Sequence, residues 1–202
     1  MRTAVLLLAA IGLASVGSGC LTIGLNRPTA AGNRTAAELA AIDQELRFFS
    51  YEHKPIHPGC VRELAMAGES DPLPKLAAID LEGCLKAKEY AGPFTVKDGT
   101  LILELGPEES FQYTYLGLTS RGAHVLLTEH QRAGTLRRIV LIVEFQLDTV
   151  LEQEQTRDRV LMKRSGTIAV STDPAVRIRF DGRLLTAENP ATKTTTTLIE
   201  LD

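Results

Sequence analysis

LRRIVLIVEFQL, at residues 136–147, is the stretch of sequence that decides the fold. Its centre, residues 139–143, has five aliphatic side chains in a row with no polar residue between them. Short runs of β-branched and other aliphatic residues are typical of strands that are buried on both faces. Turn residues precede the stretch at Ala133-Gly134. We therefore expect a long strand here, covered on both sides.

Shorter strand patterns lie on both sides of this stretch. Asp98-Gly99 separates two apolar runs, which is a strong signal of a β-hairpin. Phe111, Tyr113 and Tyr115 alternate with polar residues, as in a strand with one buried face. Further strands are expected at about residues 123–130, 158–164, 167–171, 175–180, 183–186 and 195–201, with turns at Arg121-Gly122, residues 163–166 and Asp181-Gly182. Closely spaced strands with short connections indicate an antiparallel meander that forms a sandwich, a barrel or a strongly curled sheet.

One helix is predicted before the meander. Thr35 and Glu38 have the spacing of a capping box, in which a hydroxyl and a carboxylate each accept a backbone N–H at a helix start. An apolar stripe with helical spacing follows at Leu39, Ile42, Leu46 and Phe49. We expect a helix over residues 36–49 whose stripe packs on the core.

Residues 51–93 contain five prolines and no clear periodicity. Residues 61–66 are compatible with a helical turn or two, and residues 76–90 with either a helix or a strand pair broken at Glu82-Gly83. The expected fold is α+β and predominantly antiparallel β. A single domain would span residues 35–202, with a helical and loop segment at 35–93 and a β-meander at 94–202.

Composition and charge exclude some partners. The chain has 202 residues, enough for one domain with a core, and 44% of them are hydrophobic. Aromatic residues make up only 5% and tryptophan is absent, so there is little material for stacking bases or sugars. The net charge is −3 and the pI is about 5.9. A nucleic-acid partner would require a basic surface, so we expect none.

The first twenty residues have the pattern of an export signal. Arg2 is followed by an uncharged, mostly apolar run and then by Val16-Gly17-Ser18-Gly19-Cys20. The end of this pattern resembles the lipobox of bacterial lipoproteins, with Gly17 where the family prefers leucine. The resemblance implies a signal peptide at residues 1–19, a diacylated Cys20 as the mature N-terminus, and a lipid-anchored tether at residues 20–34. An ordinary signal peptide cut near Ser18 and an uncleaved membrane span remain alternatives.

The position after the lipobox cysteine bears on localisation. Leu21 stands there in place of the aspartate that retains such proteins in the inner membrane of enteric bacteria. The resemblance therefore implies a protein of the cell envelope, anchored in the outer membrane and facing the periplasm.

The chain has three cysteines. If Cys20 carries the lipid, Cys60 and Cys84 remain, and in an oxidising compartment they are expected to form a disulfide. Two buried thiols or two ligands are the alternatives. His53, His57 and Cys60 also form a weak pattern for a copper or zinc site, but Pro55 and Pro58 oppose a helix there.

Catalytic motifs are missing from the sequence. It has no nucleophile elbow after the signal segment, no phosphate-binding loop and no zinc-protease helix. Ser165 is expected in a turn, and Glu152, Glu154 and Asp158 in a solvated hairpin region. His124 and His130 share a strand face but would lie about 20 Å apart, too far for one site. We therefore expect neither an enzyme nor a cofactor.

Three functions agree with these features. The first is a lipid-anchored envelope protein with a non-enzymatic binding or structural role, whose partner is the membrane, with another envelope protein as a candidate partner. The second is a carrier that holds a hydrophobic ligand in a lumen lined by Phe111, Tyr113, Tyr115 and residues 136–147. The third is an envelope metal-binding protein that uses His53, His57 and Cys60.

Overall fold

The computed structural model describes residues 32–67, 78–87, 92–152 and 154–201. The signal segment, Cys20 and most of the tether lie outside these residues. LRRIVLIVEFQL lies within β8 (Thr135–Glu152), and its centre is buried as expected, with Val140, Leu141 and Val143 each 0% exposed. Strand β8 pairs with β7 (His124–Arg132) on one side and with β9 (Gln155–Ala169) on the other.

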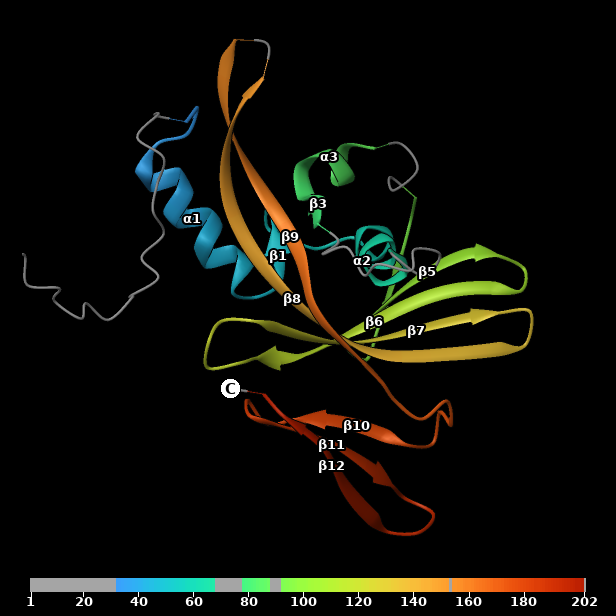
Figure 1. The fold of residues 1–202 in the computed structure, drawn as a ribbon. Coiled ribbons are helices and arrows are strands. Elements are labelled where there is room, and N and C mark those ends of the chain that lie inside the picture. The colour runs from blue at the N-terminus through green and yellow to red at the C-terminus, as the bar shows by residue number, and fades with distance from the viewer. Residues whose placement is uncertain (1–31, 68–77, 88–91, 153, 202) are drawn as a thin grey trace, which may run out of the picture.

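Within the described ranges, the main sheet has seven antiparallel strands in the order β3-β9-β8-β7-β6-β5-β4 (Figure 1). Its other members are β3 (Ala78–Asp80), β4 (Thr95–Lys97), β5 (Thr100–Gly106), β6 (Glu109–Leu118), β7 (His124–Arg132) and β9 (Gln155–Ala169). A second sheet of three strands follows, with β10 (Arg177–Phe180), β11 (Leu184–Asn189) and β12 (Thr194–Glu200) in sequence order. The prediction of an α+β fold with mainly antiparallel strands is confirmed.

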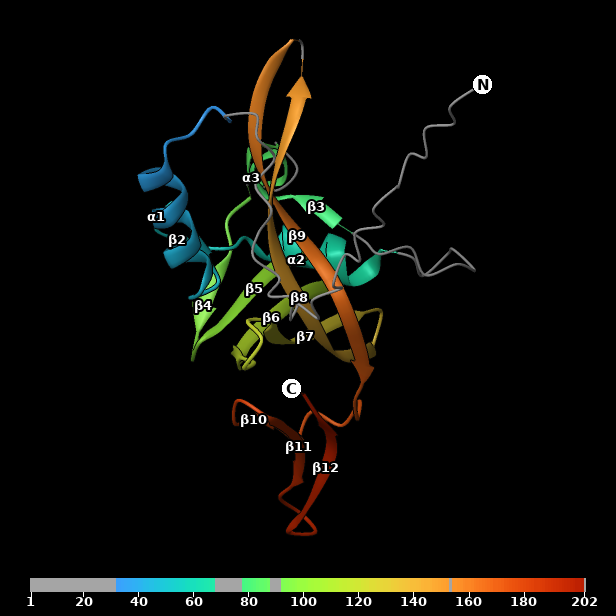
Figure 2. The ribbon, with the colours of Figure 1, turned by 60° about the vertical axis from the view of Figure 1, so that its left-hand side comes forward.

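Three layers result, because the main sheet is covered on both faces (Figures 1 and 2). On one face, Leu126 and Leu141 pack with the helical segment. On the other face, Val125 and Val140 pack with residues of the three-stranded sheet such as Leu185. Successive strand residues point to opposite faces, so the unbroken aliphatic run of β8 supplies both cores.

Two turn predictions of the meander, at Asp98-Gly99 and Ala133-Gly134, are confirmed. Lys97 pairs with Thr100 across Asp98 and Gly99, whose φ angles are 50° and 79°. Two positive φ angles in a two-residue loop match the right-handed twist of the flanking strands. Ala133 and Gly134 join β7 to β8 in the same way, with φ angles of 46° and 78°.

The strands expected at residues 158–164 and 167–171 are one strand, so the prediction of a turn between them is wrong. Strand β9 runs through this region. Its register changes from Ile142↔Gly166 to Val143↔Arg164, which leaves Ser165 as the extra residue of a β-bulge. A bulge bends and twists a strand without ending it. Ser165 therefore shapes β9, and its hydroxyl donates to the carbonyl oxygen of Ile142 at 3.3 Å.

Helix α1 (Ala36–Leu46) begins at the predicted capping box and ends three residues early. The backbone N–H of Thr35 donates to Glu38 at 2.7 Å, and the Glu38 N–H donates to the Thr35 hydroxyl at 3.3 Å. The apolar stripe faces inward, with Leu46 and Phe49 buried. Phe49 has a φ of 53°, outside helical geometry, which turns the chain out of the helix while keeping the ring in the core.

The described part of residues 50–93 contains a small hairpin and two short helices, and the helical turn predicted at residues 61–66 belongs to the first of these helices. The hairpin is β1 (Ser50–Tyr51) with β2 (Lys54–Pro55), and the helices are α2 (Pro58–Met66) and α3 (Leu81–Lys86). His57 and Asp80 cap these helices. The predicted disulfide between Cys60 and Cys84 is present and joins the two helices, with a Cα–Cα distance of 6.0 Å.

The end of the predicted tether is bound to the domain. The backbone N–H of Arg34 donates to the Asp158 carboxylate at 3.0 Å, and the Asp158 N–H donates to the Asn33 side chain at 2.8 Å. The folded domain thus includes at least two residues more than the expected start at Thr35. Within the described ranges, none of the helices has the length and apolar character needed to cross a bilayer.

Candidate functional site

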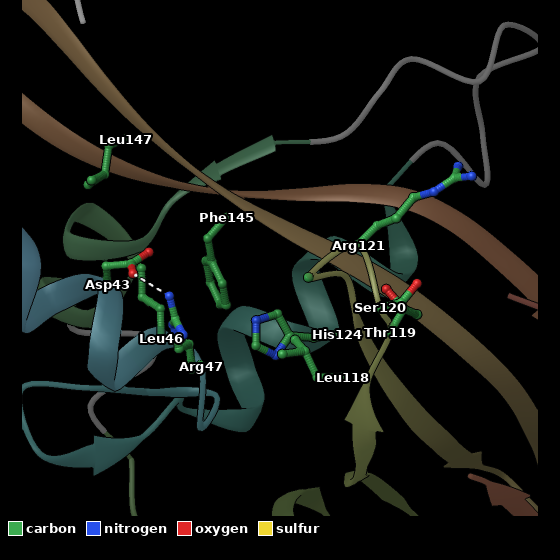
Figure 3. A pocket seen from close by; sticks show the side chains of 11 residues that line it. Asp43, Leu46, Arg47, Leu118, Thr119, Ser120, Arg121, His124, Phe145 and Leu147 are labelled. Atoms are coloured by element: carbon green, nitrogen blue, oxygen red, sulfur yellow. Dashed lines mark hydrogen bonds and ion pairs between the residues drawn. The ribbon is translucent and has the colours of Figure 1, made fainter. Parts of the chain in front are cut away.

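A pocket of about 400 Å³ opens between α1, the β6–β7 turn and the middle of β8 (Figure 3). Helix α1 contributes residues at its C-terminal end, and the β6–β7 turn contributes residues 119–122, while β7 and β8 supply the floor. The lining residues are Asp43, Leu46, Arg47, Leu118, Thr119, Ser120, Arg121, Gly122, His124, Phe145 and Leu147. This volume lies within the range of small-molecule sites, roughly 300–1,000 Å³.

Aromatic rings surround His124 at the floor of the pocket. The imidazole lies 5.4 Å from the ring of Phe49, 5.8 Å from that of Tyr115 and 5.0 Å from that of Phe145, measured between ring centroids. Phe49 reaches this position because of its left-handed backbone conformation after α1. Residues from α1's end, β6, β7 and β8 thus form one cluster.

The β6–β7 turn is held by its own hydrogen bonds. The N–H of Thr119 donates to the carbonyl oxygen of Ala123 at 2.8 Å, and the N–H of Ala123 donates to the Thr119 hydroxyl at 3.0 Å. Gly122 has a φ of 83°, a conformation that side chains disfavour. The turn therefore places Ser120 and Arg121 at the mouth of the pocket and His124 at the first position of β7.

Burial controls the charge of His124. The residue is 3% exposed, and burial lowers the pKa of its imidazole from 6.5 to about 4. The ring is therefore neutral at neutral pH. Within the described residues its Nδ1 atom is buried and has no hydrogen-bond partner. An unsatisfied buried polar atom costs about 1–3 kcal/mol, so this atom is an exception to the usual pairing.

The mouth of the pocket carries two arginines and one carboxylate. Arg47 donates to Asp43 one helical turn earlier, at 3.3 Å, and both side chains are mostly exposed. Arg121 is exposed and makes no hydrogen bond or ion pair with the described part of the chain. In Figure 3 the two arginines lie on opposite sides of the opening, and the Arg121 side chain extends away from His124. The mouth therefore has one net positive charge.

The structure places the three predicted lining residues of a lumen in different environments. Phe111 and Tyr113 are each 1% exposed, and the helical segment covers them. The Tyr113 hydroxyl donates to the carbonyl oxygen of Ile56 at 2.5 Å, and burial raises the pKa of this phenol above its usual value. Tyr115 belongs to the ring cluster around His124. The protein's own residues therefore fill the space in front of Phe111 and Tyr113.

The residues of the weak metal pattern point to separate partners. The His53 side chain is 91% exposed and pairs with Glu45. His57 accepts the N–H of Gly59 at 3.0 Å through Nδ1, and its Nε2 lies 3.0 Å from the carbonyl oxygen of Gly92. The Cys60 sulfur is bonded to Cys84. In the part of the chain that the structure describes, no group of three or more His, Cys, Asp and Glu residues is arranged to hold a metal ion.

Asp158 of the expected solvated cluster is buried and structural. It is 5% exposed, and besides Arg34 it accepts the hydroxyl of Thr149 at 2.8 Å. Glu154 has a φ of 66° in the turn between β8 and β9. Figure 1 shows this hairpin extending beyond the rest of the main sheet.

Sequence reasoning missed His124 and Arg121 as members of one site. The sequence predicts only that His124 shares a strand face with His130, which pairs with Glu109 at 2.9 Å, and that Arg121 lies in a turn. A histidine that directly follows a turn and begins a buried strand was the available signal. No protein-family model matches the chain, and neither a curated protein nor a solved structure is significantly similar to it.

Proposed function

We propose that the chain is a lipid-anchored protein of the bacterial cell envelope, with a non-enzymatic binding role for its folded domain. The anchor is the lipobox cysteine, Cys20, and the domain faces the periplasm from the outer membrane. The binding role belongs to the pocket at His124.

The observation that carries this proposal is the disulfide between Cys60 and Cys84. Structural disulfides are rare in the reducing cytosol and common in exported proteins. The pairing also accounts for two of the three cysteines and leaves the third at the lipobox, where acylation would consume its thiol. An export signal, a disulfide and a single remaining cysteine at the signal's end together favour a lipoprotein.

The distance from the anchor to the domain is short. Asn33 is held at β9 by Asp158, and it is 13 residues from Cys20. A fully extended chain of that length spans at most about 45 Å. The proposed lipid would therefore keep the domain close to the membrane surface.

The pocket favours binding over catalysis. His124 is neutral, and within the described residues no hydroxyl or carboxylate hydrogen-bonds to its Nδ1 atom. Nucleophilic catalysis uses a base that is hydrogen-bonded to its nucleophile and is oriented by a third group. An apolar floor with a charged mouth is instead the usual form of a small-ligand site.

Lipidation at Cys20 tests the proposal. The full chain is expressed in a bacterium that processes lipoproteins and is fed an alkyne-bearing fatty acid. Wild type and a conservative control, Thr22→Ser, are expected to incorporate the label and to have the intact mass of a chain that begins at Cys20 and carries acyl groups. Cys20→Ser is expected to lose the label. Equal labelling of Cys20→Ser, or an unmodified wild-type mass, would refute the anchor.

A further inference from the structure

We infer that the pocket at His124 binds a small organic monoanion, a carboxylate on an apolar body about the size of a phenyl ring. The apolar body would lie against the floor and walls, and the carboxylate would lie at the mouth between Arg47 and Arg121. The inference deepens the binding role proposed above and is independent of the lipid anchor.

Apolar walls select the body of the ligand. Leu46, Leu118, Phe145 and Leu147 line the pocket, and the last three are only half-buried in the protein alone. An aromatic or aliphatic ligand would remove the remaining apolar surface from water, which contributes about 25 cal/mol per Å². Phe145 also offers a ring face or edge to an aromatic ligand.

The floor carries one buried polar atom that has no partner among the described residues. His124 lines the pocket and is only 3% exposed. Its Nδ1 has no partner in the described structure. Because the imidazole is neutral, the floor supplies polarity without charge. Recognition of a charged group therefore falls to the side chains at the mouth.

The mouth selects one negative charge. The Asp43–Arg47 pair is exposed and one helical turn long, a type that contributes only about 0.3–0.5 kcal/mol, so a ligand carboxylate can compete for Arg47. Arg121 has no partner in the described chain, and its exposed side chain is free to turn toward the opening. Arginine binds carboxylates through charge-assisted, often bidentate hydrogen bonds. Asp43 makes a second negative charge on the ligand unfavourable.

Fluorine NMR with a matched pair of probes tests this inference. The full chain in phosphatidylcholine nanodiscs is titrated with 4-fluorophenylacetate and, separately, with its neutral analogue 4-fluorophenylacetamide; empty nanodiscs give the background. The carboxylate is expected to bind about three- to tenfold more tightly than the amide. The variant Arg47→Gln/Arg121→Gln should abolish this preference.

A second double variant controls for the loss of charge. Arg177→Gln/Arg179→Gln removes two arginines from β10, on the far side of the main sheet. Arg179 pairs with Glu188, and Arg177 has no ion pair with the described residues. It should keep the preference for the carboxylate.

Each other outcome has a distinct meaning. Equal binding of both probes, or a preference that survives Arg47→Gln/Arg121→Gln, would overturn the anion assignment and leave the binding role standing. Binding of neither probe beyond the empty-disc background would overturn the pocket assignment. The lipid anchor is scored separately, by the intact mass of the same preparation.

Discussion

Both terminal nitrogens of the Arg138 guanidinium donate to the carbonyl oxygen of Val176, each at 3.1 Å. The same group donates to the carbonyl oxygens of Ser171 and Asp173 at 2.9 Å and 2.7 Å. Its Nε donates at 2.5 Å to Glu129, which lies opposite Arg138 on the neighbouring strand β7. The Arg138 side chain is 3% exposed. One buried cation therefore joins the main sheet to the loop that leads into the three-stranded sheet.

Arg138→Met should lower the free energy of unfolding by about 3–5 kcal/mol, because it leaves three carbonyl groups and Glu129 without their buried donor. Urea unfolding would measure the loss, and amide hydrogen exchange should show β10–β12 opening first. Arg137→Met is the matched control, since Arg137 is exposed on the opposite face of the same strand. Equal losses in the two variants would contradict the role given to the Arg138 hydrogen bonds.

Removal of the disulfide should lower the free energy of unfolding by roughly 3 kcal/mol, the loop-entropy estimate for a bridge across 24 residues. The double variant Cys60→Ala/Cys84→Ala tests this in urea, where both thiols are replaced and reshuffling with Cys20 is avoided. Alkylation of the unfolded wild type with and without reductant serves as the control, and only the reduced sample should gain two labels. A wild type that is fully alkylated without reductant would show that the bridge is absent.

The β-meander could be predicted from local sequence because its signals are local. Asp98-Gly99 and Ala133-Gly134 adopt the positive φ angles that two-residue hairpins require. The aliphatic run at residues 139–143 needs two covered faces, and the two core clusters provide them. The capping box at Thr35 likewise depends only on residues three positions apart.

Other parts depend on contacts that are remote in sequence. Helix α2 is capped by His57, which is not a preferred capping residue, and its ring is also held by Gly92. The bulge at Ser165 depends on the register of β9 against β8, which has no signature in the residues 163–166 themselves. Arg34 is ordered by Asp158, 124 residues later. Periodicity contains no information of this kind.

The candidate site shows the same division. The alternation of Phe111, Tyr113 and Tyr115 correctly indicates one inward face of β6. It does not say what covers that face, and the helical segment covers most of it. His124 becomes part of a site only because Phe49, 75 residues earlier, and Phe145 are placed around it by the fold. The site is a product of tertiary structure.

Glu82→Gln should lower the free energy of unfolding by about 2–4 kcal/mol and release the segment around Arg34. The Glu82 side chain is 7% exposed; it accepts the Tyr51 hydroxyl at 2.5 Å, pairs with Arg34, and pairs with Arg157 at 3.3 Å. A neutral amide leaves two arginines without their shared counter-ion. Urea unfolding measures the loss, and hydrogen exchange at residues 33–35 measures the release.

An exposed carboxylate provides the control for Glu82. Glu200 pairs with Arg183 where both side chains are well exposed, at 46% and 71%. Glu200→Gln should therefore change the free energy of unfolding by no more than about 0.5 kcal/mol. If Glu82→Gln were as mild as Glu200→Gln, the network around Glu82 would not hold the N-terminal segment.

His124 should make the fold sensitive to acid in a defined window. Its pKa is about 4 in the folded protein, against 6.5 as the ordinary value expected in the unfolded chain. Between these values the unfolded chain binds a proton that the folded protein does not, so the free energy of unfolding falls as the pH is lowered from about 6.5 to about 4. The loss amounts to about 3 kcal/mol.

His124→Phe keeps a ring in the aromatic cluster and removes both the titration and the unpartnered Nδ1. Its free energy of unfolding should therefore fall less than that of wild type over this window, as measured by urea unfolding at half-unit pH steps. His53→Asn, which removes a histidine that is 91% exposed, should follow the wild-type profile. Parallel profiles for wild type and His124→Phe would show that the buried imidazole is not the acid-sensitive group.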